Sequence, residues 1–505
     1  MKNILEQFEH TAFVFPEKAA VISENHMTSF RDFFLKSKRV GSGMLDCIGS
    51  REPAAVLMDK STLMLEMMFG TVYAGGFYVP VDPEFPARRI AGILEVLQPA
   101  LVITVPEYAD RLAEAGWKGR VRYAAELEQA ELREERLAEI RQAALDTDPL
   151  YGIFTSGSTG TPKCVVVSHR AAIDFITTFT DTFRIDETEV LANQAPFDFD
   201  VSVKDIYSCM RTGATLVLIP RRSFSLPGEL MELLQKNHVT TLIWAVSALC
   251  ILWRLHALKY LRLPELRKVM FSGEMMPAKA FDAWRTAYPE AMFVNLYGPT
   301  EITCNCTYYV IGRGYSTEKP LPAGRAFDNE RVFLLDETDQ EITEDDKTGE
   351  LCVAGTTLAL GYYHNPEATA AAFTMNPLQK AWPEMIYRTG DLAFQRDGLL
   401  YFAGRRDFQI KHMGHRIELE EIERAMNSLP GIERSCCLYD QKKNRIIAAI
   451  FGTFDTAEVE KQLQGILPEY MIPTRFTGLT DMPLTKNGKL DRRAIADQVL
   501  GEHSL

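Results

Sequence analysis

The chain has 505 residues, of which 46% are apolar and 24% are charged, and its formal net charge at pH 7 is −13. This composition is typical of a folded globular protein, and the length leaves room for about three domains of ordinary size. The negative charge argues against a general nucleic-acid-binding protein, because binding to the phosphate backbone depends on clustered Lys and Arg side chains. Any anionic ligand must therefore be held by local groups.

The N-terminal segment carries acidic and amide side chains where a secretory signal has a basic end and an apolar stretch. The longest apolar run, residues 242–253, is shorter than the roughly 20 residues that span a bilayer. The nine cysteines are irregularly spaced and form no CxxC pair, which favours buried thiols in a reducing compartment. We therefore expect a cytoplasmic protein that is not bound to a membrane.

Short β-branched runs alternate with amphipathic helical patterns along most of the chain. Residues 106–147 form a charged block, rich in Ala and Glu, whose spacing indicates a helical connection at the surface. The runs predict strands at residues 100–105, 214–220, 239–246, 267–273 and 291–298, and helices at 227–237 and 277–289. This alternation predicts an α/β fold with largely parallel sheets.

The pattern changes after residue 404, where a dense charged turn precedes a helical stretch. About 100 residues remain, which is the size of a separate small domain. We therefore divide the chain into residues 1–406 and residues 407–505.

The segment IFTSGSTGTPKCVVVSH, residues 153–169, places a flexible and donor-rich loop between two apolar runs. Gly157 and Gly160 allow backbone conformations that other residues resist, and Lys163 adds a positive charge. The loop lacks the Gly-Lys-Ser/Thr ending of a Walker A motif. Such a loop suits phosphate oxygens, although the same composition also occurs in plain surface loops.

Four further stretches carry polar side chains on turns beside apolar strands. They are NLYGPTEITC at residues 295–304, GELCVAGTTLALGYY at 349–363, YRTGDLAFQRDGLLYFAGRRD at 387–407 and PLTKNGKLDRRAI at 483–495. Together with the loop, these blocks resemble in order and spacing the core motifs of the adenylate-forming superfamily. The resemblance covers essentially the whole chain. It is strongest to the amino-acid-activating adenylation domains of nonribosomal peptide synthetases and to the related D-alanine carrier-protein ligases.

The resemblance implies a large N-terminal domain of layered α/β subdomains and a small mobile α+β C-terminal domain. It also implies two reactions at a site between them. A carboxylate attacks the α-phosphate of ATP and expels pyrophosphate to give an acyl-adenylate, and a thiol then converts the adenylate to a thioester. Asp407 would be the hinge between the two domains.

By resemblance, Thr300 contacts the α-phosphate, Glu301 binds Mg²⁺, and Lys489 bridges the substrate carboxylate and the α-phosphate in the transition state. A magnesium ion needs only one or two carboxylates beside phosphate and water. The loop residues expected to hold the β- and γ-phosphates are Thr155, Ser156, Gly157, Ser158, Thr159, Gly160 and Lys163.

The resemblance assigns the nucleoside to four further residues. Tyr297 offers a ring for adenine stacking, and Asn295 lies near the adenine amine edge. Asp391 should accept both ribose hydroxyls, with Arg405 supporting the same region. The chain departs from the family at Cys164, where a glycine is usual, and in the turn KHMGHRIE at residues 411–418, which faces the thiol tunnel.

Asp200 in the block QAPFDFDVSVKDIY fits the position where amino-acid-activating relatives pair an aspartate with the substrate's α-ammonium. Relatives that activate aryl or fatty acids have no ammonium to neutralise, and a buried unpaired carboxylate is costly. Asp200 therefore favours an α-amino acid. By resemblance, the substrate side chain would be surrounded by Val201, Lys204, Ala245, Met270, Ser272, Leu296, Cys304 and Asn305.

Lys204 does not decide which amino acid is the substrate. Its ammonium could pair with a substrate carboxylate or amide, but a long lysine can also extend out of a pocket to solvent. D-alanine is the alternative, because the length and the motif around Asp200 resemble the D-alanine ligases.

Two other functions stay open: a ligase of the same superfamily that forms acyl- or aryl-coenzyme A, and a non-catalytic relative. The segment LGEHSL at residues 500–505 resembles a phosphopantetheine attachment site, but too few residues precede Ser504 for a carrier bundle. The carrier must then be a separate protein or a part of a longer chain. We expect the chain to be a monomer.

Overall fold

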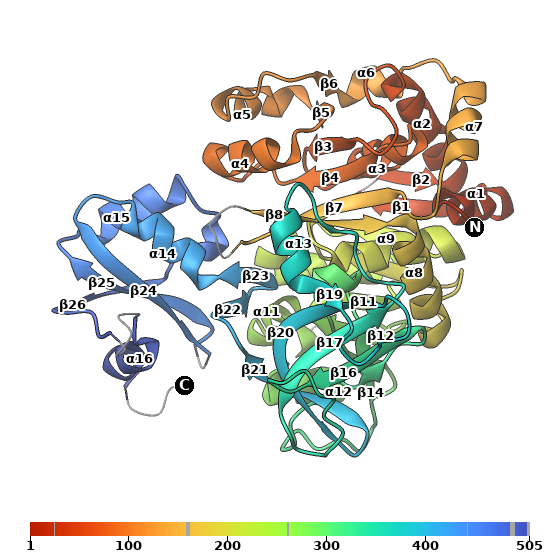
Figure 1. Cartoon of the computed structure of the whole chain (residues 1–505). Coiled ribbons are helices and arrows are strands. Elements are labelled where there is room, and N and C mark those ends of the chain that lie inside the picture. The colour runs from red at the N-terminus through yellow and green to blue at the C-terminus, as the bar shows by residue number, and fades with distance from the viewer. Residues whose placement is uncertain (25, 158–161, 260–261, 442, 485–489, 502–505) are drawn as a thin grey trace.

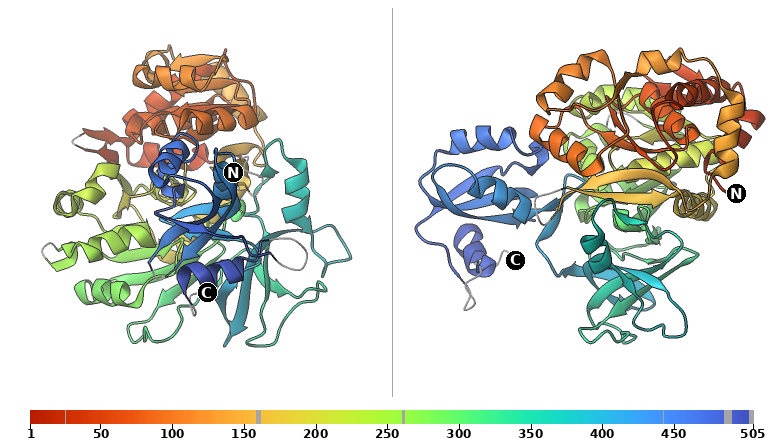
Figure 2. Two further views of the ribbon diagram at one scale, coloured as in Figure 1. Left: turned by 90° about the vertical axis from the view of Figure 1, so that its left-hand side faces the viewer. Right: turned by 45° about the horizontal axis from the view of Figure 1, so that its top comes forward.

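A computed structural model shows three sheets packed together and a smaller C-terminal unit beside them (Figure 1). Figure 2 shows the same arrangement from two other sides, and its right-hand view shows the C-terminal unit and the N-terminus on opposite sides of the molecule. The described residues are 1–24, 26–157, 162–259, 262–441, 443–484 and 490–501. Within these residues, no helix has the length and apolar character needed to cross a membrane.

The first sheet has seven strands in the order β18-β8-β7-β4-β3-β5-β6, and its five strands from β7 to β6 are parallel. Strands β3 and β4 are buried along their whole length, as expected for parallel strands covered on both faces. The strands are β3 (Pro53–Leu57), β4 (Phe77–Val81), β5 (Leu101–Thr104), β6 (Val121–Tyr123), β7 (Pro149–Thr155), β8 (Lys163–Ser168) and β18 (Gly361–Tyr362).

The second sheet has nine strands in the order β15-β14-β13-β12-β11-β9-β10-β1-β2, and it is parallel from β13 to β1. Its strands are β1 (Ala19–Ser23), β2 (His26–Ser29), β9 (Val190–Asn193), β10 (Thr215–Leu218), β11 (Thr241–Ala245), β12 (Lys268–Ser272), β13 (Met292–Tyr297), β14 (Thr307–Ile311) and β15 (Arg325–Ala326). The five strands expected from the sequence are thus β5, β10, β11, β12 and β13, and the largely parallel arrangement is confirmed.

The two sheets share a layer of helices. Alternate residues of both sheets, such as Val56 of β3 and Leu216 of β10, join one hydrophobic cluster with that layer, whereas Leu57 and Val217 face the outer helices. The shared helices are α1 (Leu5–Val14), α2 (Phe30–Met44), α3 (Thr62–Tyr73), α8 (His169–Phe183) and α9 (Val201–Thr212). The outer helices are α4 (Ala87–Leu97), α10 (Pro227–Lys236), α11 (Val246–Arg254) and α12 (Ala278–Ala287), so both predicted helices are confirmed.

The charged block at residues 106–147 is only partly a helical connection. It forms three short helices, α5 (Ala109–Glu114), α6 (Ala124–Glu128) and α7 (Glu134–Ala143), but β6 lies among them and pairs in parallel with β5. The prediction missed this strand because only three residues form it and pairing with a buried neighbour outweighs their weak pattern. The block begins with the short 3₁₀ turn η1 (Pro106–Tyr108), and further 3₁₀ turns in the chain are η2 (Arg221–Ser225), η3 (Ala257–Lys259) and η5 (Glu469–Met471).

The third sheet is antiparallel and carries the GELCVAG and YRTGD motifs. Its strands are β16 (Glu330–Leu335), β17 (Gly349–Gly355), β19 (Phe373–Met375), β20 (Met385–Arg396) and β21 (Leu399–Arg405), with helix α13 (Pro366–Ala372) beside them. Pairing of β20 with β21 places Asp391 opposite Arg405, so these two motif residues are neighbours across the sheet.

Residues after Asp407 form the C-terminal unit, which has its own hydrophobic clusters. A hairpin of β22 (Gln409–His412) and β23 (His415–Glu418) reaches toward the large part of the molecule (Figure 1). The rest comprises α14 (Leu419–Asn427), β24 (Ile432–Asp440), β25 (Arg445–Gly452), α15 (Thr456–Gln464), β26 (Arg475–Leu479) and α16 (Arg492–Leu500). The boundary at residue 407 stays a prediction.

Helix α1 offers a direct test of the shared helical layer. The Phe8 ring is fully buried, with ring centroids 5.0 Å from Phe33 and 5.2 Å from Phe69. We expect Phe8→Ala to lower the free energy of unfolding by about 3–5 kcal/mol, because it leaves a cavity in a packed core. Phe13 on the same helix is 84% exposed, so Phe13→Ala should change that free energy by less than about 0.5 kcal/mol.

Urea denaturation of both variants measures the two changes in the free energy of unfolding. Equal losses for Phe8→Ala and Phe13→Ala would contradict the burial of one face of α1.

Candidate active site

The predicted nucleoside residues meet where the second and third sheets touch. The Tyr297 hydroxyl donates a hydrogen bond to the Asp391 carboxylate, and the Arg405 guanidinium forms an ion pair with the same carboxylate. Asn295 lies two residues before Tyr297, but its side-chain amide donates to the Pro322 carbonyl at 2.7 Å. The structure therefore brings Tyr297, Asp391 and Arg405 together, whereas the Asn295 amide is engaged with the backbone.

Arg405 also contacts the predicted hinge residue. Its Nε lies 2.6 Å from Asp407 Oδ1 and its Nη2 lies 2.8 Å from Asp407 Oδ2, which is a two-point contact. One guanidinium thus joins the carboxylate of Asp391 to that of Asp407. A hinge role for Asp407 stays a prediction.

Glu301 lies in the short turn η4 (Thr300–Ile302), directly after β13, and its side chain is fully buried. Its carboxylate accepts a hydrogen bond from the Tyr362 hydroxyl at 2.7 Å, and Arg416 Nη1 lies 2.8 Å from each carboxylate oxygen. Burial alone would raise the pKa of Glu301, but the Arg416 charge and the Tyr362 hydrogen bond hold that pKa below its ordinary value. The buried carboxylate is therefore ionised.

The donor set around Glu301 fits a magnesium ion only if other oxygens complete it. Among the described residues, no group of three or more His, Cys, Asp or Glu side chains could hold a metal ion. Magnesium is often held by one or two carboxylates together with phosphate oxygens and water. Glu301 thus suits a magnesium ion that arrives with nucleotide phosphates, and it does not form a metal site by itself.

The predicted phosphate loop is described in part. Ser158, Thr159 and Gly160 lie outside the described residues, as does Lys489. Thr155 ends strand β7 and Gly157 follows it after Ser156, whereas Lys163 begins β8 with its ammonium 5.2 Å from the centre of the Tyr362 ring.

The Ser156 hydroxyl is already engaged. It donates to the Arg416 carbonyl at 2.8 Å and accepts from the Glu418 backbone N–H at 3.2 Å. Both partners belong to strand β23 of the C-terminal unit, so this unit contacts the loop directly.

The predicted amino-acid pocket lies beside these groups, at the start of helix α9. Asp200 precedes that helix, and loss of water around its carboxylate raises its pKa, while a hydrogen bond from Thr300 opposes the rise. Lys204 is fully buried, and its ammonium donates to Asn305 Oδ1 at 2.6 Å. The Cys304 thiol donates to the same oxygen at 3.6 Å. Lys204 therefore points inward, and the alternative in which it reaches solvent is wrong.

Four of the remaining predicted pocket residues lie on strands of the second sheet. Ala245 and Ser272 are paired neighbours at the ends of β11 and β12, and Met270 and Leu296 are buried in the same sheet. Val201 packs against the main hydrophobic cluster at the start of α9.

The β22–β23 hairpin brings residues into the site that the sequence did not assign. Lys411 lies 5.6 Å from the centre of the Tyr297 ring, and Asp391 and Asp200 are the carboxylates that act on its charge. At the tip of the hairpin, Gly414 has a positive φ of 85°, and its N–H donates to Glu274 at 2.8 Å. The only signal in the sequence was the unusual turn KHMGHRIE, which marked the segment but not its contacts.

Other contacts hold the C-terminal unit against the large part of the molecule. The His415 ring lies between Tyr470, at a centroid distance of 3.4 Å, and Phe199, at 4.4 Å. Arg89 of α4 forms a buried ion pair with Glu421 of α14 at 2.5 Å. We call this arrangement, in which the hairpin enters the site, the docked arrangement.

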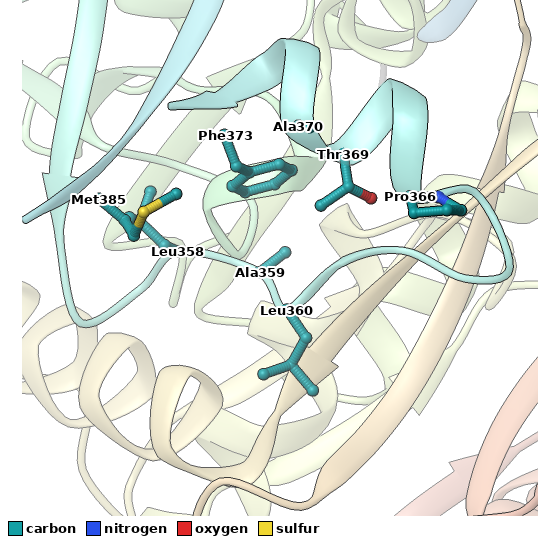
Figure 3. A pocket seen from close by; sticks show the side chains of 8 residues that line it. All are labelled: Leu358, Ala359, Leu360, Pro366, Thr369, Ala370, Phe373 and Met385. Carbon is teal, nitrogen blue, oxygen red and sulfur yellow. The ribbon is translucent and has the colours of Figure 1, made fainter. Parts of the chain in front are cut away.

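Two cavities lie outside the site. The larger, about 450 Å³, is lined by apolar side chains around α13 and contains none of the predicted site residues (Figure 3). The second, about 310 Å³, lies between the second and third sheets and also contains none of them. Lys411 and Arg416 of the hairpin instead reach the predicted site, where they lie against the Tyr297 ring and the Glu301 carboxylate.

Comparison with known proteins places the chain in a family. The model of the AMP-binding enzyme family matches residues 8–363. The chain belongs to the AMP-binding enzyme family. This family member is 32% identical to the D-alanine–D-alanyl carrier protein ligase of Bacillus velezensis, over 99% of this chain and 100% of that protein.

A second relative of this family member is tyrocidine synthase 1 of Brevibacillus parabrevis, which is 29% identical over 98% of this chain. The chain spans only 45% of that synthase. In structure, it resembles the Vibrio cholerae adenylation domain AlmE in complex with glycyl-adenosine-5′-phosphate, with a TM-score of 0.86, 20% identity, and 99% and 98% of the two chains covered. The similarity to AlmE confirms the expected α/β fold.

The hairpin contacts give a testable prediction about the docked arrangement. We expect His415→Ala to weaken docking by about 1 kcal/mol, because it removes the contact of the imidazole with Phe199 of the large part of the molecule. Small-angle X-ray scattering should then show a larger radius of gyration. His412→Ala is the matched control, because the His412 ring on the same hairpin packs against Tyr439 within the C-terminal unit.

The radius of gyration of His412→Ala should equal that of the unaltered protein. An unaltered radius in His415→Ala as well, with the fold intact by circular dichroism, would contradict a role of His415 in docking.

Proposed function

We propose that the chain activates an amino acid with ATP and transfers it to the phosphopantetheine thiol of a separate carrier protein. The observation that carries this proposal is the position of Asp200. Its carboxylate accepts a hydrogen bond from Thr300, a predicted nucleotide residue, and the charge of Lys204 in the predicted pocket also acts to lower its pKa. A carboxylate at that position can pair with the α-ammonium of an amino acid whose own carboxylate faces the nucleotide.

The first reaction joins the amino acid to the nucleotide. A carboxylate oxygen of the substrate attacks the α-phosphorus of ATP, a C–O–P bond forms, and the bond to the departing pyrophosphate breaks. Tyr297, Asp391 and Arg405 would position the nucleoside, and Thr300 would contact the α-phosphate. Glu301 would hold a magnesium ion, which when bound supplies positive charge beside the phosphates.

Lys489 would place its ammonium beside the reacting groups, where its charge stabilises the transition state more than the bound substrates.

The second reaction transfers the acyl group to sulfur. The thiolate of the carrier attacks the acyl carbon, the C–S bond forms, and AMP leaves with the electrons of the C–O bond. The names of the relatives support a carrier as acceptor, since one of them is a D-alanyl carrier protein ligase.

A cytoplasmic location fits the cysteines. All nine are free and buried, which is typical of proteins from a reducing compartment.

The test of the proposal is amino-acid-dependent exchange of labelled pyrophosphate into ATP. We expect exchange with one or a few members of a panel that includes the standard amino acids and D-alanine. Lys489→Ala should lose most of this exchange, while transfer from a preformed adenylate to the carrier stays largely intact.

Exchange that depends on aryl or fatty acids would contradict the proposal and favour a coenzyme A ligase. Equal loss of both reactions in Lys489→Ala, with the fold preserved, would contradict the role of Lys489.

The buried Lys204 limits the range of candidate substrates. Its buried ammonium donates to the amide oxygen of Asn305, another predicted pocket residue, so a substrate side chain with a carboxylate or amide could bind both. Aspartate, glutamate and their amides have such a side chain together with the α-ammonium that Asp200 would bind. D-alanine is the second candidate, and it is favoured by the full-length similarity to a D-alanine ligase.

Lys204→Met separates these candidates. For an acidic or amide substrate we expect a loss in kcat/KM equivalent to about 2–5 kcal/mol, because the variant removes one member of a buried charge pair. Small apolar amino acids should be spared. The measurement is pyrophosphate exchange across the same panel, and an unchanged ranking of amino acids would exclude an acidic or amide substrate and favour D-alanine.

A further inference from the structure

The carboxylate of Glu301 is the meeting point of the two parts of the chain. It is fully buried, and Arg416 reaches it from strand β23 with one nitrogen 2.8 Å from each carboxylate oxygen. The Tyr362 hydroxyl takes a further position on one of these oxygens. In the docked arrangement the carboxylate is thus enclosed and its charge is compensated by Arg416.

The same strand, β23, also forms hydrogen bonds with the neighbouring predicted phosphate loop. The Ser156 hydroxyl, which was expected to bind phosphate, is held by the Arg416 carbonyl and the Glu418 N–H. The hairpin therefore occupies both the expected metal ligand and an expected phosphate ligand.

A guanidinium and a divalent cation cannot share these two oxygens. Each carboxylate oxygen has few acceptor positions, and two positive groups on one buried carboxylate would repel each other strongly at low dielectric. The carboxylate also cannot be left alone, because a buried ion without a partner is strongly destabilising. One cation or the other must therefore accompany Glu301 while it stays buried.

We propose that Arg416 and the divalent cation are alternative partners of Glu301, so that bound metal excludes the docked arrangement and Arg416 replaces the metal when the hairpin docks. Arg416 is then a positioning residue whose charge makes the docked arrangement possible once the metal has left. This inference rests on the proposed function only in that it takes Glu301 as the metal ligand.

The structure supplies a matched control for Arg416. The buried pair of Arg89 and Glu421 also joins the large part of the molecule to the C-terminal unit. Glu421 accepts a hydrogen bond from the Gly157 N–H of the loop, but in the described part of the chain the pair does not touch Glu301. Loss of this ion pair should reduce the population of the docked arrangement, but that population should still fall when metal is added.

The experiment measures the distance between the two parts of the full chain. Glu367 on α13 and Glu460 on α15 are exposed, whereas all nine native cysteines are buried, so Glu367→Cys and Glu460→Cys can be spin-labelled selectively. Pulsed electron paramagnetic resonance gives the distance distribution with and without Mg²⁺ and inorganic pyrophosphate. No amino acid, carrier or turnover is required.

We expect the labelled protein to lose the docked distance when Mg²⁺ and pyrophosphate are added. Arg89→Met should start with a smaller docked population and still respond to Mg²⁺. In Arg416→Met the distance distribution should not respond to Mg²⁺, while Arg416→Lys, which keeps the charge, should restore a response. Arg416→Lys also serves if Arg416→Met fails to fold.

Metal binding is measured separately with Mn²⁺ on the unlabelled protein, from the resonance of free Mn²⁺. Removal of a competing cation should tighten Mn²⁺ binding about tenfold in Arg416→Met, because more of the protein is then competent to bind. Glu301→Gln should lose this binding. If Glu301→Gln binds Mn²⁺ as well as the unaltered protein does, Glu301 is not the metal ligand and that part of the proposed function fails.

Two results would overturn the inference while leaving Glu301 as a metal ligand. One is a distance distribution of the otherwise unaltered protein that is the same with and without Mg²⁺ and pyrophosphate. The other is a response of Arg416→Met that equals the response of Arg89→Met, which would show that Arg416 does not compete with the metal.

Discussion

A buried carboxylate must have a positive or hydrogen-bonding partner, and this requirement at Glu301 connects the parts of the molecule. Glu301 follows β13 of the nine-stranded sheet, Tyr362 belongs to the seven-stranded sheet, and Arg416 belongs to the C-terminal unit. Burial would raise the pKa of Glu301, yet these two partners keep it ionised. The position of the small unit is thus tied to the charge of one side chain in the large part of the molecule.

The arrangement of the sheets explains why the site residues are far apart in the sequence. Tyr297 ends a strand of the nine-stranded sheet, Asp391 lies in the antiparallel sheet, and Ser156 follows a strand of the seven-stranded sheet. Parallel strands whose carboxyl ends meet at one edge are a common place for ligands in α/β proteins. The candidate site therefore forms only when all three sheets have packed, since each sheet contributes at least one of the predicted ligands.

The sequence predicted those helices and strands that a short stretch of residues specifies by its own apolar pattern. Apolar runs such as 267–273 indicated their strands because full burial of a parallel strand needs a continuous apolar stretch. Asp391, Arg405 and Asp200 could be named as candidates because the motifs of the resemblance carry them, although Asp391 and Arg405 lie within strands β20 and β21 and not on turns. Arg416 and Tyr362 were missed, because their contacts with Glu301 join positions 115 and 61 residues apart, and periodicity holds no information at that distance. The sequence could not predict the direction of the Lys204 side chain, because a buried lysine and one that extends to solvent fit the same motif around Asp200.

The close approach of the hairpin tip to the substrate pocket limits how the pocket can change. A Cβ placed on Gly414 would lie 3.3 Å from the Cβ of Ala245, a pocket position at the end of β11. A larger side chain at position 245, which would shrink the predicted pocket, would also press on the turn at Gly414 in the docked arrangement. The size of the side chain at position 245 would thus affect both the volume of the predicted pocket and the fit of the hairpin tip against it. A redesign of amino-acid preference at this position has to be judged by acyl transfer as well as by activation.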